Sequence, residues 1–190
     1  NILYIIRRYV ERSNPIYNNA DYYIIDKTDV FTPMVKLIDL IKEKNIEANI
    51  IIKPHPKNSI AELQNDFKSL DYQHIEISRE PIYELVLRAD LAVSIHSTIL
   101  FIPILMGIPT IIINNSLYEK VVEKWPLLKN IYNNFSFFIE DSKEIENLFS
   151  KNINLISGNN IDSCTNDIKH IYKYYSSNSA NNALQYLAEL

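Results

Sequence analysis

The sequence predicts an α/β fold in which helices cover both faces of a parallel sheet. Short runs of β-branched residues alternate with amphipathic segments along most of the 190 residues, an order typical of parallel sheets. Several of the runs are apolar on both faces, as expected for strands buried between two layers of helices. We therefore predict a Rossmann-like domain over residues 1–150. Residues 151–190 are expected to form a linker and C-terminal helices that pack back on this domain or on another that precedes it.

The expected strands are short apolar runs separated by turn-forming or amphipathic segments. In chain order they are Ile2–Ile6, Tyr22–Ile25, Asn49–Lys53, His74–Ile77, Leu91–Ile95, Thr110–Asn114 and Phe135–Ile139. Because neighbouring parallel strands need a crossover connection, helices are expected between them.

The helices are predicted from capping residues and apolar stripes. Thr32 and Pro33 fit an N-cap and a first helical position, and the apolar stripe after them ends at Lys42–Asn45. The other expected helices are Ile60–Leu70 after Ser59, Ile82–Arg88 after Pro81, Lys143–Phe149 after Ser142, Asp167–Tyr175 and Asn181–Leu190. The Asn- and Ser-rich segment Ile153–Asn166 is typical of a loop or linker.

The longest apolar stretch, Thr98–Ile113, contains a further helix and a strand. It is shorter than the roughly 20 residues of a membrane span and is interrupted by Pro103, Gly107 and Pro109. It therefore indicates buried protein interior. Pro103 predicts a kink or a late start of the helix, and Gly107 favours left-handed backbone where that helix ends.

Composition excludes several classes of site. The only two glycines, Gly107 and Gly158, cannot form a Gly-rich dinucleotide loop, a P-loop or a G-x-S-x-G elbow. A net charge of -4 argues against nucleic acid as a partner. The single cysteine, Cys164, can form neither an internal disulfide nor, alone, a zinc site. No metal-ligand spacing is found, so no metal or other cofactor is expected. Because the chain opens on Asn1 without a signal segment, we expect it to be a piece of a longer protein.

The first candidate site is a histidine bracketed by prolines at the end of a strand. In Lys53-Pro54-His55-Pro56 the prolines fix the backbone around His55. The carboxyl end of a strand is where open α/β sheets bind ligands, so the imidazole can donate to a phosphate. The alternative is a turn histidine that only satisfies nearby carbonyls.

The second candidate site follows the strand Leu91–Ile95. His96, Ser97 and Thr98 form a polar turn at the start of a helix, where hydroxyls and unpaired backbone N–H groups can bind an anion. The alternative is that Ser97 or Thr98 only caps that helix.

Two further segments end at the same edge of the predicted sheet. The loop and helix start with Ser78, Glu80, Pro81 and Tyr83 could hold a nucleoside, with Glu80 or Glu84 near ribose hydroxyls. The alternative is an ordinary helix start with acidic residues in its first turn. Arg7 and Arg8 follow the first strand and could contact a negative ligand, or remain surface arginines.

Together these motifs resemble a known group of bacterial transferases. The motifs are K-P-H-P at a strand end, the E-P-x-x-E helix start, A-D-x-x-x-S-x-H-S-T, and G-x-P-T-I-I-I after an apolar run. The segment Ile50–Asn114 resembles the nucleotide-binding half of GT-B transferases that use cytidine-activated donors. These are the bacterial sialyltransferases and polysialyltransferases, the capsule Kdo transferases and the teichoic-acid glycerophosphotransferases.

The resemblance implies metal-independent transfer of a sialic acid or Kdo type sugar from a CMP-activated donor to a glycan or glycolipid hydroxyl in capsule or lipooligosaccharide synthesis. It implies that His55 contacts and protonates the departing phosphate and that Ser97 and Thr98, beside His96, bind the same phosphate. Lys53, Pro54, Ser78, Glu80, Pro81 and Tyr83 are then expected around the nucleoside. The acceptor's base would come from a preceding domain, and the protein would work in the cytoplasm or at the cytoplasmic face of the inner membrane.

Three other functions remain open at this stage. A CDP-glycerol or CDP-ribitol polyol-phosphate transferase has the same fold class. A nucleotide-sugar epimerase or hydrolase would need further carboxylates, and a non-catalytic nucleotide-binding module would not depend on His55.

Overall fold

The computed structural model describes residues 1–10, 25–95 and 97–113, and from there to residue 139 only residues 119, 122–123, 126, 128–129 and 137–139. His96, the linker and the helices expected after residue 140 lie outside this part of the chain, as does the division into residues 1–150 and 151–190.

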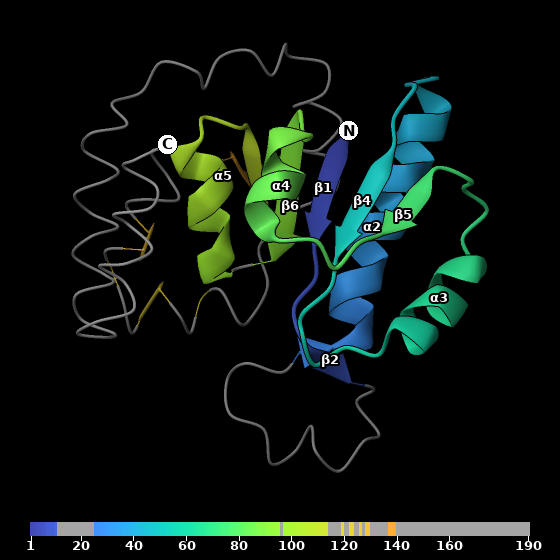
Figure 1. Ribbon diagram of the computed structural model, residues 1–190, viewed down its shortest axis with the longest axis horizontal. Helices are drawn as coiled ribbons and strands as arrows, with labels where there is room; N and C mark the ends of the chain where they lie inside the picture. Colours follow the sequence, from blue (N-terminus) through green and yellow to red (C-terminus); the bar gives the residue numbers. More distant parts are fainter. Residues whose placement is uncertain are drawn as a thin grey trace.

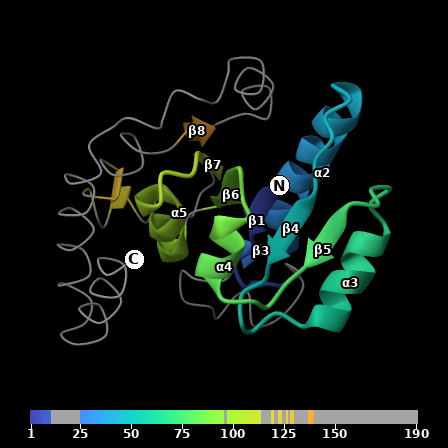
Figure 2. The same cartoon turned by 45° about the horizontal axis from the view of Figure 1, so that its top comes forward.

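A six-stranded parallel sheet forms the centre of the molecule. Its strands are β1 (Ile2–Ile5), β4 (Ile50–Lys53), β5 (Ile75–Ile77), β6 (Leu91–Ile95), β7 (Thr110–Ile113) and β8 (Phe137–Ile139). They are arranged in the order β5-β4-β1-β6-β7-β8, which can be followed across the view in Figure 2. Every neighbouring pair is parallel. This is the doubly wound strand order of Rossmann-like folds, so the predicted fold class is confirmed.

Helices cover both faces of the sheet. They are α2 (Lys27–Glu43), α3 (Ile60–Lys68), α4 (Ile82–Leu87) and α5 (Phe101–Leu105), with a 3₁₀ turn, η1 (Thr98–Leu100), before α5. In Figure 1 α2 lies behind the sheet and α4 in front of it. Phe31 of α2 packs on Phe67 of α3, with ring centroids 5.1 Å apart, and α4 contacts α5. The chain therefore crosses from one face to the other between α3 and α4.

Strand β1 occupies the middle of the core. All four of its residues are buried, and it pairs with β4 on one side and β6 on the other. Its Tyr4, only 1% exposed, donates its hydroxyl to the carbonyl of Val30 in α2 at 3.0 Å. This bond joins the sheet to the helix layer behind it and satisfies the buried phenol. Burial also raises the pKa of Tyr4 well above its usual range.

The start of α2 differs from the prediction. The helix begins at Lys27 and not after Thr32, and Pro33 lies inside it. Asp26 is the N-cap, because its carboxylate accepts from the backbone N–H of Thr28 at 2.9 Å. This cap lets the helix bury Val30 and Met34, and their burial offsets the backbone hydrogen bond that Pro33 cannot donate.

The other described helices confirm their predicted starts. Ser59 caps α3 by accepting from the N–H of Glu62 at 3.4 Å, and Pro81 directly precedes α4. Pro103 lies in the first turn of α5, where no intrahelical donor is needed, so the late start is confirmed. Gly107 ends this helix with a φ of 72°, the left-handed conformation predicted for it.

A smaller parallel pair, β2 (Tyr9–Val10) and β3 (Ile25–Asp26), lies beyond the carboxyl end of β1. Among the described residues, no helix combines the length and the apolar character needed to cross a bilayer.

Candidate functional site

The segments with predicted site residues meet at one edge of the sheet. Arg7 and Arg8 follow β1, His55 follows β4, Ser78 follows β5 and Ser97 follows β6. Since all four strands are parallel, these residues lie at their carboxyl ends. The strand order reverses between β1 and β6. Such a switch point is where open α/β sheets form their ligand crevice.

His55 is held by the turn that follows β4. The backbone N–H of Asn58 donates to the His55 carbonyl at 2.9 Å, and the N–H of Lys57 donates to Nδ1 of the imidazole at 3.2 Å. Because Nδ1 is the acceptor, the neutral ring carries its hydrogen on Nε2. Pro54, before the turn, is buried, and the imidazole is half-buried. The ring can therefore donate to a ligand through Nε2.

Positive charge surrounds this imidazole. Burial, and then the nearby charges of Arg7, Lys57 and Arg8, lower the pKa of His55 below its ordinary value. These cations come from two loops, after β1 and after β4. In a chain with a net charge of -4, this is a local concentration of positive charge at the carboxyl ends of β1 and β4, next to the switch point. An anion placed among these groups would be stabilised and would favour the protonated imidazole.

Asn58 joins three of the loops at this edge. Its Nδ2 donates to the carbonyl of Arg7 at 3.1 Å, and its own carbonyl accepts from Nη2 of Arg79 at 2.9 Å. Its backbone N–H closes the turn at His55. Asn58 is only 7% exposed. One buried residue thus connects the loops that follow β1, β4 and β5.

Lys53 supports the loop that follows β5. Its Nζ donates to the carbonyl of Glu80 at 2.6 Å and to that of Arg79 at 3.3 Å. Burial, followed by the charge of Arg79, lowers the pKa of Lys53, while Glu80 opposes this shift. In this structure the ammonium therefore holds the loop in which a nucleoside contact was predicted.

Ser78 is the first residue of that loop. It is buried, its backbone N–H donates to the carbonyl of Ile52 at 2.9 Å, and its Oγ accepts from the N–H of Glu80 at 3.2 Å. Its hydroxyl oxygen thus closes a local turn. The loop therefore presents a fixed backbone to this edge of the sheet.

The acidic and aromatic candidates lie at the start of α4. The Glu80 carboxylate pairs with Nη2 of Arg88 at 2.8 Å, so the predicted ribose contact would compete with this exposed ion pair. Pro81 is exposed and Tyr83 is half-buried in the first turn of α4.

Ser97 directly precedes η1. Its backbone is extended, its carbonyl accepts from the N–H of Leu100 at 3.0 Å, and its side chain makes no capping hydrogen bond. The alternative prediction, that Ser97 caps the helix through its side chain, is therefore wrong. Thr98 is exposed in the first position of the turn. Because η1 and α5 are each short, their dipole contributes little to anion binding, and the basic side chains contribute more.

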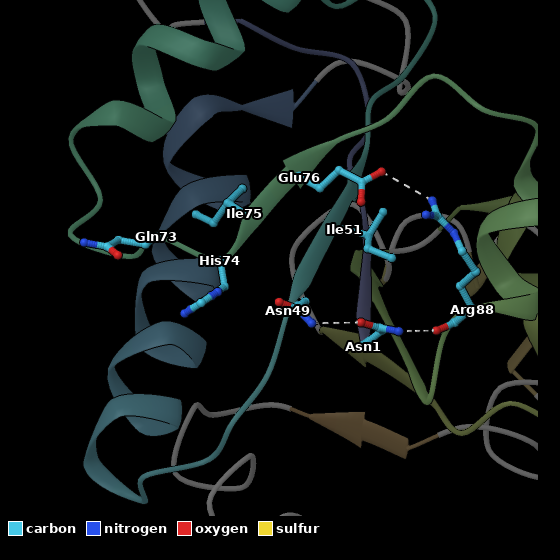
Figure 3. A pocket seen from close by; sticks show the side chains of 8 residues that line it. All are labelled: Asn1, Asn49, Ile51, Gln73, His74, Ile75, Glu76 and Arg88. Atoms are coloured by element: carbon cyan, nitrogen blue, oxygen red, sulfur yellow. Dashed lines mark hydrogen bonds and ion pairs between the residues drawn. The ribbon is translucent and has the colours of Figure 1, made fainter.

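Two hollows lie away from this edge. Figure 3 shows one of about 320 Å³ at the amino ends of the strands, lined by Asn1, Asn49, Ile51, Gln73, His74, Ile75, Glu76 and Arg88. The other lies between α2 and α3. The candidate site at the carboxyl ends of the strands is therefore identified by strand order and charge and not by a hollow. His74, which precedes β5, lies at the opposite, amino-terminal edge of the sheet.

Sequence reasoning missed three residues of the site. Lys57 and Asn58 follow the K-P-H-P motif directly, and Arg79 lies next to Ser78. The run of turn-forming residues after His55 is a signal that could have indicated Lys57 and Asn58, whereas Arg79 has no such local signal. Within the described residues, no group of three His, Cys, Asp or Glu side chains could hold a metal ion.

Comparisons with known proteins assign no family to this chain. No protein-family model matches it, and a search of curated proteins found no significant similarity.

Proposed function

We propose that this chain is the donor-nucleotide-binding part of a bacterial glycosyltransferase. It would move a sialic acid or Kdo type sugar from a CMP-activated donor to a glycan hydroxyl in capsule or lipooligosaccharide synthesis. The observation that supports this proposal most directly is the histidine beside three cations at the carboxyl ends of β1 and β4, next to the switch point of the sheet. A phosphate is the common biological anion that such an environment suits.

The chemistry follows from the orientation of His55. As the acceptor oxygen attacks the anomeric carbon, the bond from that carbon to the phosphate oxygen breaks and its electron pair goes to the phosphate. The Nε2–H of His55 donates to this oxygen, and Arg7, Arg8 and Lys57 offset the negative charge that develops. The hydroxyls of Ser97 and Thr98 donate to the remaining phosphate oxygens.

The other half of the reaction lies outside this site. The proton of the acceptor hydroxyl must go to a base. The resemblance of this chain's motifs to GT-B transferases implies that this base lies in a preceding domain. The loop Ser78–Pro81, held by Lys53, offers backbone groups to the cytosine and ribose.

A second candidate is a polyol-phosphate transferase with a CDP-activated donor. The observation that favours it is the abundance of positive charge, since Arg79, bonded to the Asn58 carbonyl, adds a further cation at this edge of the sheet. Such a number of cations suits a diphosphate. In that reaction the acceptor attacks phosphorus, and CMP again leaves.

Calorimetric titration with CMP, CDP, UMP, UDP and GDP tests the proposal. We expect CMP to bind best, and preference for CDP would favour the second candidate. His55→Ala should weaken binding at least tenfold, while the matched control His74→Ala, at the opposite edge, should leave it unchanged. Ser97→Ala should weaken binding less, with Ser69→Ala, an exposed serine at the C-terminal end of α3, as its control. Preference for a uridine or guanosine nucleotide, or equal effects of His55→Ala and His74→Ala, would contradict the proposal.

A further inference from the structure

The buried amide of Asn58 has a role that the proposed reaction does not describe. We infer that Asn58 is the positioning residue of the site, which fixes the His55 imidazole relative to the β1 loop with Arg7 and Arg8. The inference deepens the proposed function and rests on it for its meaning in phosphate binding. The orientation of the His55 imidazole, which the inference predicts, can be measured without any ligand.

The first argument is the pattern of the hydrogen bonds. The backbone of Asn58 is bonded to His55 within its own turn and to Arg79. The bond from its side chain is directed to the Arg7 carbonyl, 51 residues away in sequence. The side chain therefore attaches the histidine turn to the β1 loop, while its backbone holds that turn closed.

The second argument is energetic. Asn58 is 7% exposed, so water cannot readily replace its amide at the Arg7 carbonyl, and loss of the amide would remove this hydrogen bond between the turn and the β1 loop. The loop after β1 would then be free to move away from the turn. The turn would equally be released from the loop. Since Lys57 binds Nδ1 of His55 from within this turn, a movement of the turn would change both the direction of Nε2–H and its distance from the arginines.

The third argument is the charge that faces the imidazole. Arg7 is the strongest of the three cations that act on His55, ahead of Lys57 and Arg8. A contact that sets the place of the Arg7 backbone also sets how strongly its guanidinium acts on the ring and on a bound phosphate. Asn58 thereby acts through its neighbours and needs no contact with the substrate.

Nitrogen NMR of the imidazole in the ligand-free chain tests this directly. The signals of His55 are assigned by comparison with His55→Gln, and the shifts of Nδ1 and Nε2 report which nitrogen carries the hydrogen. In the native chain we expect the hydrogen on Nε2. In Asn58→Ala we expect a mixture of tautomers and an imidazole pKa that moves toward the ordinary value. Asn58→Ser, which keeps a donor, should restore part of the native signature, and Asn65→Ala on the exposed side of α3 should change nothing.

Titration with CMP then separates the inference from the proposed function. We expect Asn58→Ala to raise the Kd for CMP about tenfold, and to add nothing further in a His55→Ala background. If the native chain binds CMP, and Asn58→Ala has the same Kd and the same imidazole shifts as the native chain, the inference is wrong and the proposed function stands. Failure of the native chain to bind any nucleotide, with the shifts changed in the variant, would overturn the proposed function alone.

Instability of the variant does not remove the test. If Asn58→Ala does not fold, Asn58→Ser supplies the comparison. If neither folds, the native spectrum decides: hydrogen on Nδ1 would mean that the turn does not hold His55 as described, and the inference would be wrong.

Discussion

Lys53 offers the sharpest test of how the candidate site is built. The sequence suggests a nucleoside ligand at this position, whereas the structure directs its ammonium to the carbonyls of Glu80 and Arg79 at 2.6 and 3.3 Å. Lys53→Met keeps most of the side-chain volume and removes only the charge and the donors. If Lys53 supports the loop, the substitution should lower both the stability of the chain and its affinity for a nucleotide.

The expected loss of stability follows from the two bonds. A hydrogen bond to a charged group contributes about 1.5–3 kcal/mol when it is well shielded. Here the longer bond is weak, and the half-exposed ammonium also interacts with water, so we expect a total of about 1–2 kcal/mol. With a urea dependence of about 2 kcal/mol per M, the unfolding midpoint should fall by about 0.5–1 M.

Urea unfolding followed by circular dichroism measures this change, with Lys42→Met as the matched control. Lys42 pairs with Asp71 at 3.3 Å, but Asp71 is fully exposed, so loss of this ion pair should leave the unfolding midpoint almost unchanged. A Lys53→Met midpoint within error of the Lys42→Met midpoint would refute the supporting role. Weakened CMP binding with unchanged stability would instead identify Lys53 as a direct ligand.

Three further predictions concern the rest of the chain. Asp66→Ala should cost about 2–3 kcal/mol in urea unfolding, because it removes charge-assisted bonds to Lys27 at 2.5 Å and to Tyr9 at 2.9 Å. Tyr9→Phe should then add little in the Asp66→Ala background. The free energy of unfolding should fall as the pH drops below 6.5, since the unfolded chain protonates His55 there while the folded chain, with its lowered pKa, does not yet do so. His55→Gln should reduce this slope. Gly107→Ala should lower the free energy of unfolding by only about 1 kcal/mol, as measured from the change in Tm. The φ of 72° makes alanine unfavourable here, but an added Cβ meets no atom within 4 Å, so no steric clash adds to this backbone cost.

Each of these predictions has a clear contrary result. Full additivity of the Asp66 and Tyr9 substitutions would show that the bond between them contributes nothing. Equal pH slopes in the native chain and His55→Gln would contradict the lowered pKa of His55. A loss above about 3 kcal/mol in Gly107→Ala would point to a clash beyond the backbone cost.

Strands were predicted more accurately than the first helix. Leu91–Ile95 is confirmed at both ends, and Ile2–Ile5 and Ile50–Lys53 each begin or end within one residue of the prediction. Uninterrupted apolar runs are local signals that burial on both faces requires. The start of α2 was misplaced because Thr32-Pro33 is also a local signal for a helix start. Capping by Asp26 and the burial of Val30 and Met34 against the sheet outweighed it.

The sequence alone determined which residues lie at strand ends. The proline-bracketed His55, the arginines after β1 and the hydroxyls after β6 were recognised because each strand end is marked by a local change from apolar to polar residues. The scarcity of glycine likewise indicated in advance that a phosphate would have to be held by side chains and ordinary turns.

Only the tertiary structure decided how these ends are connected. That β1 lies between β4 and β6 follows from pairing between segments up to 89 residues apart, and no local pattern carries that information. The same pairing brings Arg7 close enough to lower the pKa of His55, and it buries the amide of Asn58 against a loop from another strand. Local residue patterns determine which groups are available at this edge, whereas long-range backbone pairing determines which of them act together.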